Sequence, residues 1–297
     1  MIRPPVAAFV RCLGFTLVMA GVVASTPPRL GEALMCAGGN ELFLIDVNSS
    51  EQGSARKLWR WSGEDCEGLE KDERSWFHHL DECRFIEGRS KILVTASNSG
   101  CALIDRAGGK VLWRASVTNA HSIELLPYNR VVVASSLSGD QLVLFDLGRS
   151  YEPLAKTPLR SAHGVIWDGP RERLWALGFD ELRCYKLIDW ETRQPSLTLE
   201  STDRLPDADG HDLRAVPQSH DLILSTEKSV WLFDRKQHTF RSHPMIGQYA
   251  GVKSLDIHPT TGRIVVGRWG TEAELLSPAG KISFSPNRPY KVRWFAR

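Results

Sequence analysis

The chain has 297 residues, of which 42% are hydrophobic and 24% charged, a composition typical of a globular protein. Its formal net charge is only +2, so it lacks the strong basic excess of nucleic-acid-binding domains, and we expect no nucleic-acid partner. Ten tryptophans are many for this length, and tryptophan favours strands.

Residues 1–25 have the order of a secretory signal peptide. Arg3 and Arg11 accompany an apolar run from Cys12 to Val23, and the small residues Ala24 and Ser25 follow. The run is shorter than the roughly 20 residues of a membrane-spanning helix; the alternative is an N-terminal anchor that is not cleaved. Cleavage would leave a secreted or periplasmic protein with no membrane span, which we expect to be a monomer.

After this segment, residues 33–62 contain three short apolar runs separated by turns. Residues 63–80 then form an insertion, which ends in the sequence SWFHHL just before Asp81. From Asp81 onward the chain repeats one arrangement five times: an apolar run, a short turn, two further apolar runs and a weaker fourth. The units begin at Asp81, His121, His163, His211 and Lys253.

Four short strands at a period near 40 to 45 residues are typical of a β-propeller blade. The final run, at Tyr290, is a first strand without successors, whereas residues 33–62 supply second, third and fourth strands without a first. We therefore predict an all-β fold, with one domain over residues 33–297. It is a six-bladed propeller closed by the C-terminal strand, which joins the two ends and removes an exposed sheet edge.

The first strands, aligned by position, place a polar or titratable residue at the start of every blade. These residues are Asp81, His121, His163, His211, Lys253 and Tyr290, and the residue two places later is apolar in each. In propellers the first strand of each blade lines the central channel. We therefore expect the six side chains to ring one mouth of the channel. Loops expected at the same face add the candidate ligand contacts His79, Asn98 and Trp269, with Arg268, Trp76 and His78 beside them.

Two interpretations of the repeated histidine remain open. Each histidine can fasten its blade by a hydrogen bond to a neighbouring strand, a purely structural role. Alternatively, His121, His163 and His211 converge on one divalent metal ion (Mn, Zn or Ca), because three imidazoles with an open fourth position suit a catalytic site. In that case Asp81 could complete the metal shell, and Lys253 or Tyr290 could act as acid, base or anion contact.

The whole mature chain resembles secreted bacterial six-bladed propeller proteins of an uncharacterised family, a resemblance that implies fold and export. The blade pattern and the three histidines also resemble oligogalacturonate-lyase-type propellers, which hold a metal through histidines at the channel mouth and cleave uronic-acid sugars by β-elimination. This second resemblance implies that the three histidines grip the metal and that Lys253, Tyr290 or Arg268 handles the proton or the charge. Trp269 and Trp76 would offer flat faces to a sugar ring.

The function thus has two candidates from the sequence. One is a metal-dependent lyase or hydrolase acting on acidic carbohydrate. The other is a non-enzymatic propeller that uses the same face to bind a small molecule, a glycan or a protein. An enzyme needs the histidines within metal reach of one point, whereas a scaffold needs only a broad face.

The cysteines give one further expectation. Cys36, Cys101 and Cys184 lie in strand-like runs, where they are expected to be buried as small apolar residues. Cys66 and Cys83 flank a polar insertion and form the most plausible disulfide of an exported chain, although spacing alone does not fix the pairing.

Overall fold

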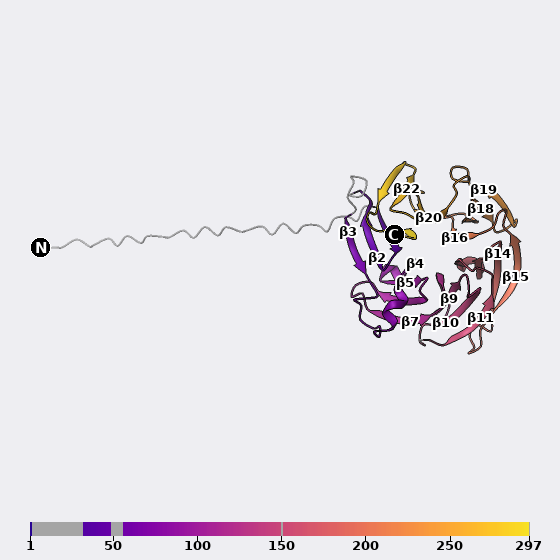
Figure 1. Cartoon of the computed structure of the whole chain (residues 1–297), viewed down its shortest axis with the longest axis horizontal. Helices are drawn as coiled ribbons and strands as arrows, with labels where there is room; N and C mark the ends of the chain where they lie inside the picture. The colour runs from indigo at the N-terminus through magenta and orange to yellow at the C-terminus, as the bar shows by residue number, and fades with distance from the viewer. Residues whose placement is uncertain (2–31, 49–55, 150, 297) are drawn as a thin grey trace.

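The computed structural model describes residues 1, 32–48, 56–149 and 151–296 (Figure 1). Its strands form six four-stranded antiparallel sheets arranged in a ring, which confirms the predicted six-bladed propeller. The predicted signal peptide falls outside the described residues except for Met1. Where the structure describes the chain, it has no helix long and apolar enough to cross a membrane.

Each blade is numbered here from the start of the ring, and its strands run from the channel outward. Blade 1 consists of β24 (Lys291–Trp294), β1 (Ala33–Gly38), β2 (Glu41–Asp46) and β3 (Lys57–Trp61). Blade 2 consists of β4 (Leu80–Ile86), β5 (Lys91–Ala96), β6 (Gly100–Asp105) and β7 (Val111–Ser116). Blade 3 consists of β8 (Ala120–Leu126), β9 (Arg130–Ser135), β10 (Gln141–Asp146) and β11 (Pro153–Pro158).

The second half of the ring repeats this order. Blade 4 consists of β12 (Gly164–Asp168), β13 (Arg173–Leu177), β14 (Glu181–Ile188) and β15 (Ser196–Arg204). Blade 5 consists of β16 (Gly210–Ala215), β17 (Asp221–Thr226), β18 (Val230–Asp234) and β19 (Thr239–Ser242). Blade 6 consists of β20 (Val252–Ile257), β21 (Ile264–Arg268), β22 (Glu272–Leu276) and β23 (Gly280–Ser283). The described loops contain three short 3-10 helices: η1 (Glu73–Phe77), η2 (Glu87–Arg89) and η3 (Gly169–Arg171).

The two ends of the described propeller meet in blade 1, as predicted. Strand β24 pairs antiparallel with β1, in a register that sets Leu34 opposite Trp294 and Cys36 opposite Val292. The N–H of Phe295 continues the pairing by donating to the carbonyl of Ala33 at 2.8 Å. This pairing joins the sixth blade to the second through the first and satisfies an edge of β1 that would otherwise be open.

The core lies between neighbouring blades. One apolar cluster combines Leu93 and Trp113 of blade 2 with Val133 and Phe145 of blade 3, and each of these side chains is at most 6% exposed. Because the middle strands are covered on both faces, they read as continuous apolar runs, such as RVVVAS in β9, all six residues of which are buried. The strand periodicity of the sequence is therefore weak where burial is greatest.

Several tryptophans link the outer part of one blade to the next by hydrogen bonds. The indole N–H groups of Trp59 and Trp61 in blade 1 donate to the carbonyls of Arg106 and Gly109 in blade 2, both at 2.9 Å, and Trp113 of blade 2 donates to Arg149 of blade 3 at 3.0 Å. A buried indole needs such a partner for its N–H group. These contacts account for part of the high tryptophan content.

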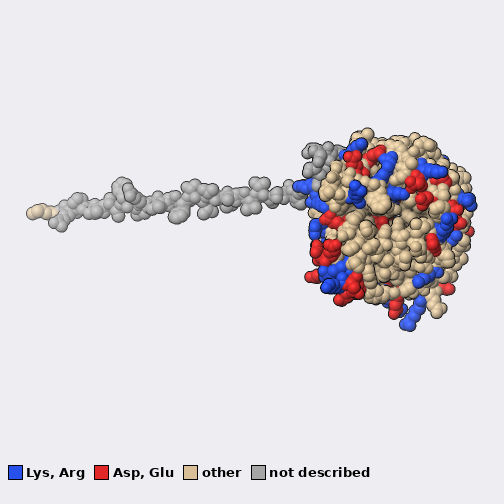
Figure 2. All heavy atoms as spheres, in the orientation of Figure 1, with Lys and Arg blue, Asp and Glu red and all other residues tan. Residues whose placement is uncertain are grey.

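The surface in the view of Figure 2 carries acidic and basic side chains intermingled around the rim of the ring. Its central part is formed mainly by uncharged residues. This face therefore presents no extended field of one sign, such as a phosphate backbone would need.

The expected Cys66–Cys83 disulfide is wrong. Both residues are free thiols, as are Cys36, Cys101 and Cys184, and all five are buried. Cys66 lies in the insertion with its thiol 3.6 Å from the carbonyl of Gly63, whereas Cys83 lies on β4 and faces the carbonyl of Met35 in blade 1. The sequence placed the two residues near one loop, but Cys83 belongs to the innermost strand.

Candidate functional site at the channel mouth

The predicted mouth residues are placed by β-bulges. In blades 3, 5 and 6 the pairing of the innermost strand skips one residue, and the residue skipped is His121, His211 or Lys253. A bulged residue leaves the ladder and can turn its side chain away from the sheet face. The repeated polar residue is thus the position at which each innermost strand bends at the channel mouth.

The other three blades reach the same layer in different ways. In blade 2 the pairing jumps from Leu80 to Cys83, so both Asp81 and Glu82 lie in the irregular stretch. In blades 4 and 1 the mouth residue immediately precedes the strand. The N–H of His163 donates to Leu177 O at 2.8 Å, and that of Tyr290 donates to Ala37 O at 2.7 Å.

The structure brings the three histidines into a row. The ring centroids of His121 and His163 are 4.2 Å apart, those of His163 and His211 are 5.3 Å apart, and Tyr290 lies 5.7 Å from His121 on the other side. All four rings meet edge to face. The three histidines are 9%, 6% and 5% exposed, so they line the wall of the mouth rather than project from it.

His121 and His163 are each oriented through Nδ1. His121 Nδ1 lies 3.2 Å from the carbonyl of Asn119, and His163 Nδ1 lies 3.0 Å from Ser136 Oγ. Burial lowers the pKa of His121 to about 4 and lowers that of His163 strongly. Both imidazoles are therefore neutral near pH 7. Among the described residues, no hydrogen bond uses the Nε2 atom of either ring.

His211 belongs to a separate charged cluster. Its Nε2 lies 2.9 Å from Glu227 Oε2 and 3.7 Å from Asp209 Oδ2, and the ammonium of Lys253 lies 2.5 Å from the same nitrogen. Lys253 also donates to Glu227 at 2.8 Å. The Nδ1 atom of His211 is buried without a partner.

Within the described chain, the residues whose ligand atoms come close enough to share one metal ion are Asp209, His211 and Glu227. Their atoms lie within 4.8 Å of one another. Two carboxylates and one imidazole can coordinate a divalent cation. Here the Lys253 ammonium supplies a positive charge beside the group, through its contacts with His211 and Glu227. Asp209 and Glu227 were not predicted as site residues, because they lie in loops outside the aligned first strands.

Asp81 is the buried acid of the mouth. It is 4% exposed and its Oδ2 lies 2.5 Å from Ser97 Oγ and 4.0 Å from His121 Nδ1. Burial raises its pKa to about 8, although the Ser97 hydroxyl and the charge of Lys291 act in the opposite direction. Asp81 is thus mostly protonated at neutral pH.

Replacing Asp81 with asparagine is expected to remove a pH dependence of stability. Because its folded-state pKa is raised, the contribution of Asp81 to stability is complete below about pH 4 and is lost as the pH rises to about 8. Between pH 7 and 8 the free energy of unfolding of the wild type should fall, by up to about 1.4 kcal/mol per pH unit. The lowered pKa values of His121 and His163 affect stability only below the ordinary histidine pKa of about 6.5, and so do not contribute in this range.

The measurement is urea denaturation of the wild type and Asp81→Asn at several values in this pH range. The variant should show a flatter curve and the higher stability at pH 8. Asp234→Asn is a matched control, because backbone N–H groups lower the pKa of that exposed carboxylate, so it should leave the slope unchanged. Equal slopes in the wild type and Asp81→Asn would show that Asp81 is ionised at pH 7.

The other predicted contact residues do not cluster with the histidine row. Trp269 is 70% exposed and its ring lies 6.1 Å from that of Tyr290, so it stands beside the mouth. The guanidinium of Arg268 pairs with Glu274, donates to Ala250 O at 3.1 Å and stacks over Tyr249. It therefore makes none of its described contacts with the histidine row.

The insertion before blade 2 and the loop between β5 and β6 direct their side chains elsewhere. Asn98 is exposed and donates to the carbonyl of Ser75 at 3.4 Å, and His79 is exposed with a positive φ of 55°. His78 lies 3.4 Å from Glu64, and the ring of Trp76 packs against Tyr151, 6.1 Å away. The described contacts of these residues do not include His121, His163 or His211.

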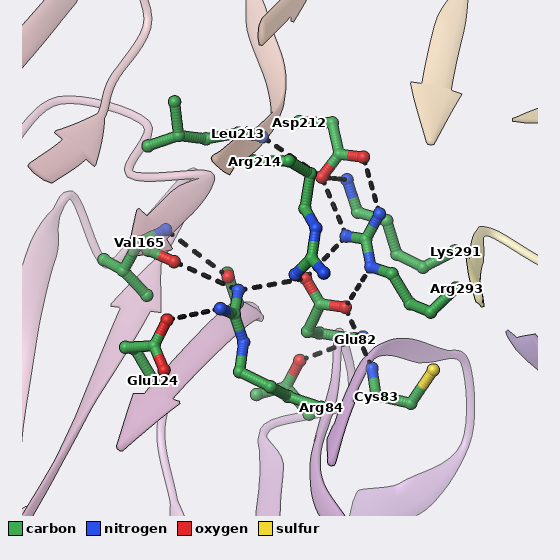
Figure 3. Close-up of polar contacts among 12 residues, drawn as sticks. Glu82, Cys83, Arg84, Glu124, Val165, Asp212, Leu213, Arg214, Lys291 and Arg293 are labelled. Atoms are coloured by element: carbon green, nitrogen blue, oxygen red, sulfur yellow. Dashed lines mark hydrogen bonds and ion pairs between the residues drawn. The ribbon is translucent and has the colours of Figure 1, made fainter. Parts of the chain in front are cut away.

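Below the mouth a buried ion network fills the channel (Figure 3). Arg293 is 2% exposed and uses all five of its N–H groups: two to Glu82, two to Asp212 and one to Leu255 O, over 2.7–3.0 Å. The fully buried Lys291 completes the group with contacts to Asp212 and to the carbonyls of His211 and Lys253. This network forms the floor of the mouth.

Polar side chains at two positions of the innermost strands also connect neighbouring blades by hydrogen bonds. One place after the mouth residue, the side chains of Ser122, Asp212 and Ser254 each accept a hydrogen bond from a backbone N–H group of the next blade. Three places after it, the side chains of Glu124 and Asp256 do the same. The channel-facing edge of an innermost strand has unpaired N–H groups, and these side chains satisfy them. A second signal in the sequence could have revealed this layer, because Arg84, Glu124, Arg214, Asp256 and Arg293 all lie three places after the mouth residue.

Comparison with known proteins gives a family but no activity. A search of the curated proteins found no match. Residues 44–294, which include most of every blade, match the family model described as "Family of unknown function (DUF6528)". The chain therefore belongs to the family of unknown function DUF6528.

Proposed function

We propose that this chain is a ligand-binding β-propeller whose site is the histidine-lined mouth, and that the site takes a divalent metal ion. The observation that carries the proposal is the row of neutral imidazoles in which Nε2 of His121 and Nε2 of His163 are unused by the described residues, next to the Asp209, His211 and Glu227 group. Neutral imidazole is the form that ligates a metal. The N-terminal sequence supports export.

This arrangement offers two binding positions for the ion, which we call the carboxylate seat and the histidine seat. In the first, Asp209, His211 and Glu227 bind the ion after the Lys253 ammonium moves away, since both cations need the same lone pairs. In the second, the ion lies between the three histidines, whose rings would first have to turn, because their ligand atoms do not come as close together as those of Asp209, His211 and Glu227. Mixed nitrogen and carboxylate ligands favour zinc over manganese, and calcium prefers six to eight oxygen ligands.

A second candidate function, a metal-dependent lyase or hydrolase acting on acidic carbohydrate, is favoured by the exposed Trp269 beside Tyr290. An exposed aromatic ring offers a flat apolar face to a sugar. The metal would supply the attraction for a uronate carboxylate. Lys253, once released from Glu227, would supply a proton donor or a positive charge near the same carboxylate.

Zinc binding measured by titration calorimetry on tag-free protein tests the proposal. The Lys253→Met variant is expected to bind zinc at least about tenfold more tightly than the wild type, because the competing ammonium is gone. Glu227→Gln should weaken binding by at least about tenfold if the carboxylate seat is used. The double variant His121→Ala, His163→Ala should do so if the histidine seat is used.

Lys281→Met is the matched control, since that exposed lysine pairs only weakly with Glu272, at 3.8 Å, and its loss should not change zinc affinity. The zinc-loaded protein is then incubated with oligogalacturonate. Formation of unsaturated uronate would establish the lyase function, whereas binding without turnover would leave the ligand-binding function. Absence of zinc and manganese binding in both the wild type and Lys253→Met would overturn the metal site.

A further inference from the structure

A second cavity opens at the other end of the channel. Its volume is about 560 Å³ and it is lined by the C-terminal ends of innermost strands, including Arg84, Trp167, Arg214 and Trp294. The mouth described above lies at the N-terminal ends of the same strands. Because the network around Arg293 fills the channel between them, the two ends are separate sites (Figure 3).

The cavity contains hydrogen-bond donors that lack acceptors. The Nε atom of Arg214 donates to Asp256 at 3.0 Å, but in the described part of the chain neither Nη atom of Arg214 has a hydrogen-bond partner. The Nε atom of Arg84 and the Nε1 atom of Trp294 are buried without a partner among the described residues. Buried donors are normally paired, so those of Arg84 and Trp294, together with the Nη atoms that Arg214 presents to the cavity, point to a ligand that brings acceptor atoms.

The acceptors of the cavity wall are already engaged. Glu124 accepts from Arg84 and from the N–H groups of Leu125 and Trp167, and Asp256 accepts from Arg214 and from the N–H of Trp294. A cationic or purely donating ligand would therefore find few free lone pairs. An oxyanion would meet the free edge of the Arg214 guanidinium.

The charge and size of the cavity restrict the chemical class of the ligand further. Of the arginines that line the cavity, Arg293 is paired with Glu82 and Asp212, whereas Arg214 has one carboxylate partner, Asp256. One guanidinium edge suits a monoanion better than a phosphate dianion. Phe85, Trp167 and Trp294 contribute aromatic wall, and the volume is in the range of sites for small organic molecules.

We propose that this cavity binds a small ring-containing carboxylic acid, with the carboxylate on the two Nη atoms of Arg214 and the ring against Trp167. A guanidinium edge presents two parallel N–H donors, the geometry that a carboxylate accepts. The ring replaces water on the aromatic wall. This site is independent of the proposed metal site, since its residues lie on the other side of the ion network.

Titration calorimetry with benzoate as the probe tests the proposal, on metal-free protein. Benzoate is expected to bind the wild type at least about tenfold more tightly than its neutral analogue benzamide or the dianion phenyl phosphate. Arg214→Met should weaken benzoate binding by about tenfold to a hundredfold. Arg214→Lys should recover only part of the loss, because it keeps the charge without the fork.

Because Arg214 also pairs with Asp256, Arg214→Met removes an ion pair as well as the proposed ligand contact. A second variant therefore tests the site without breaking that pair. Trp167→Ala removes aromatic wall without touching an ion pair and is expected to weaken benzoate binding while leaving the benzamide-to-benzoate preference intact. Lys281→Met, which replaces an exposed lysine that does not line this cavity, should bind benzoate as the wild type does. Equal affinity for benzoate and benzamide, or unchanged benzoate binding in folded Arg214→Met, would overturn the site.

Discussion

Replacing Arg293 with methionine is expected to lower the free energy of unfolding by about 3–5 kcal/mol. The substitution keeps most of the side-chain volume but leaves the carboxylates of Glu82 and Asp212, 1% and 2% exposed, without the guanidinium that pairs with both. The charge of Arg293 is the leading favourable influence that keeps the pKa of Glu82 and of Asp212 below their ordinary values. Without it, burial would favour protonation of these groups.

The measurement is a urea denaturation curve at pH 7, followed by tryptophan fluorescence. Arg241→Met is the matched control, because Arg241 also makes two contacts with one carboxylate, that of Asp221, but its side chain is 53% exposed. Solvent screening limits such a surface pair to about 1 kcal/mol or less. If both variants lose the same small amount, the network is not a significant source of stability.

A pH profile separates the two explanations for a loss in Arg293→Met. Uncompensated carboxylates are tolerated better when they are protonated, so the variant should recover part of its deficit as the pH is lowered from 7 to about 5. A deficit caused only by altered packing would stay constant over this range.

The overall architecture could be predicted because it depends on a repeat. Each blade buries the same positions, so the runs around Val131, Leu222 and Ile264 recur at similar spacing. The closure also follows from the sequence. Residues 33–62 lack a first strand and the final run is a first strand without a blade, so each completes the other. The structure confirms both, with β24 beside β1.

The position of the mouth residues could be predicted, but not the means of placing them. Alternation along a strand would put His121 and Ile123 on one face, whereas the bulge removes His121 from the ladder and Ile123 packs in the core. A bulge depends on pairing with the second strand, and one strand alone does not contain that information. The position could be read from six aligned strands because a polar or titratable residue recurs there, three times as histidine.

The partners of the mouth could not be predicted. Asp209 and Glu227 come from loops, and their approach to His211 depends on how two turns of blade 5 fold. The ion network is a different case, since its charges lie one and three places after the mouth residue in several blades. Attention to apolar periodicity alone overlooked them, because buried charges in an innermost strand violate the usual pattern.

Deleting β24, by ending the chain at Pro289, is expected to prevent stable folding. The deletion removes Val292 and Trp294 from the core of blade 1, and it removes Lys291 and Arg293 from the channel network. It also exposes the edge of β1. The summed losses should equal or exceed the stability of a typical domain, about 5–15 kcal/mol. Circular dichroism and size-exclusion chromatography should show an unfolded or aggregated chain.

A circular permutant distinguishes loss of the strand from loss of its connection. Strand β24 runs antiparallel to β1, and Phe295 N–H lies 2.8 Å from Ala33 O. A two-residue Asn-Gly loop can therefore join Ala296 to Glu32. With the chain opened between Asn287 and Arg288, all four strands of blade 1 become consecutive. This permutant should fold with nearly the thermal stability of the wild type. If it fails as the deletion does, the link between β23 and β24, and not the closing strand alone, is required for the ring.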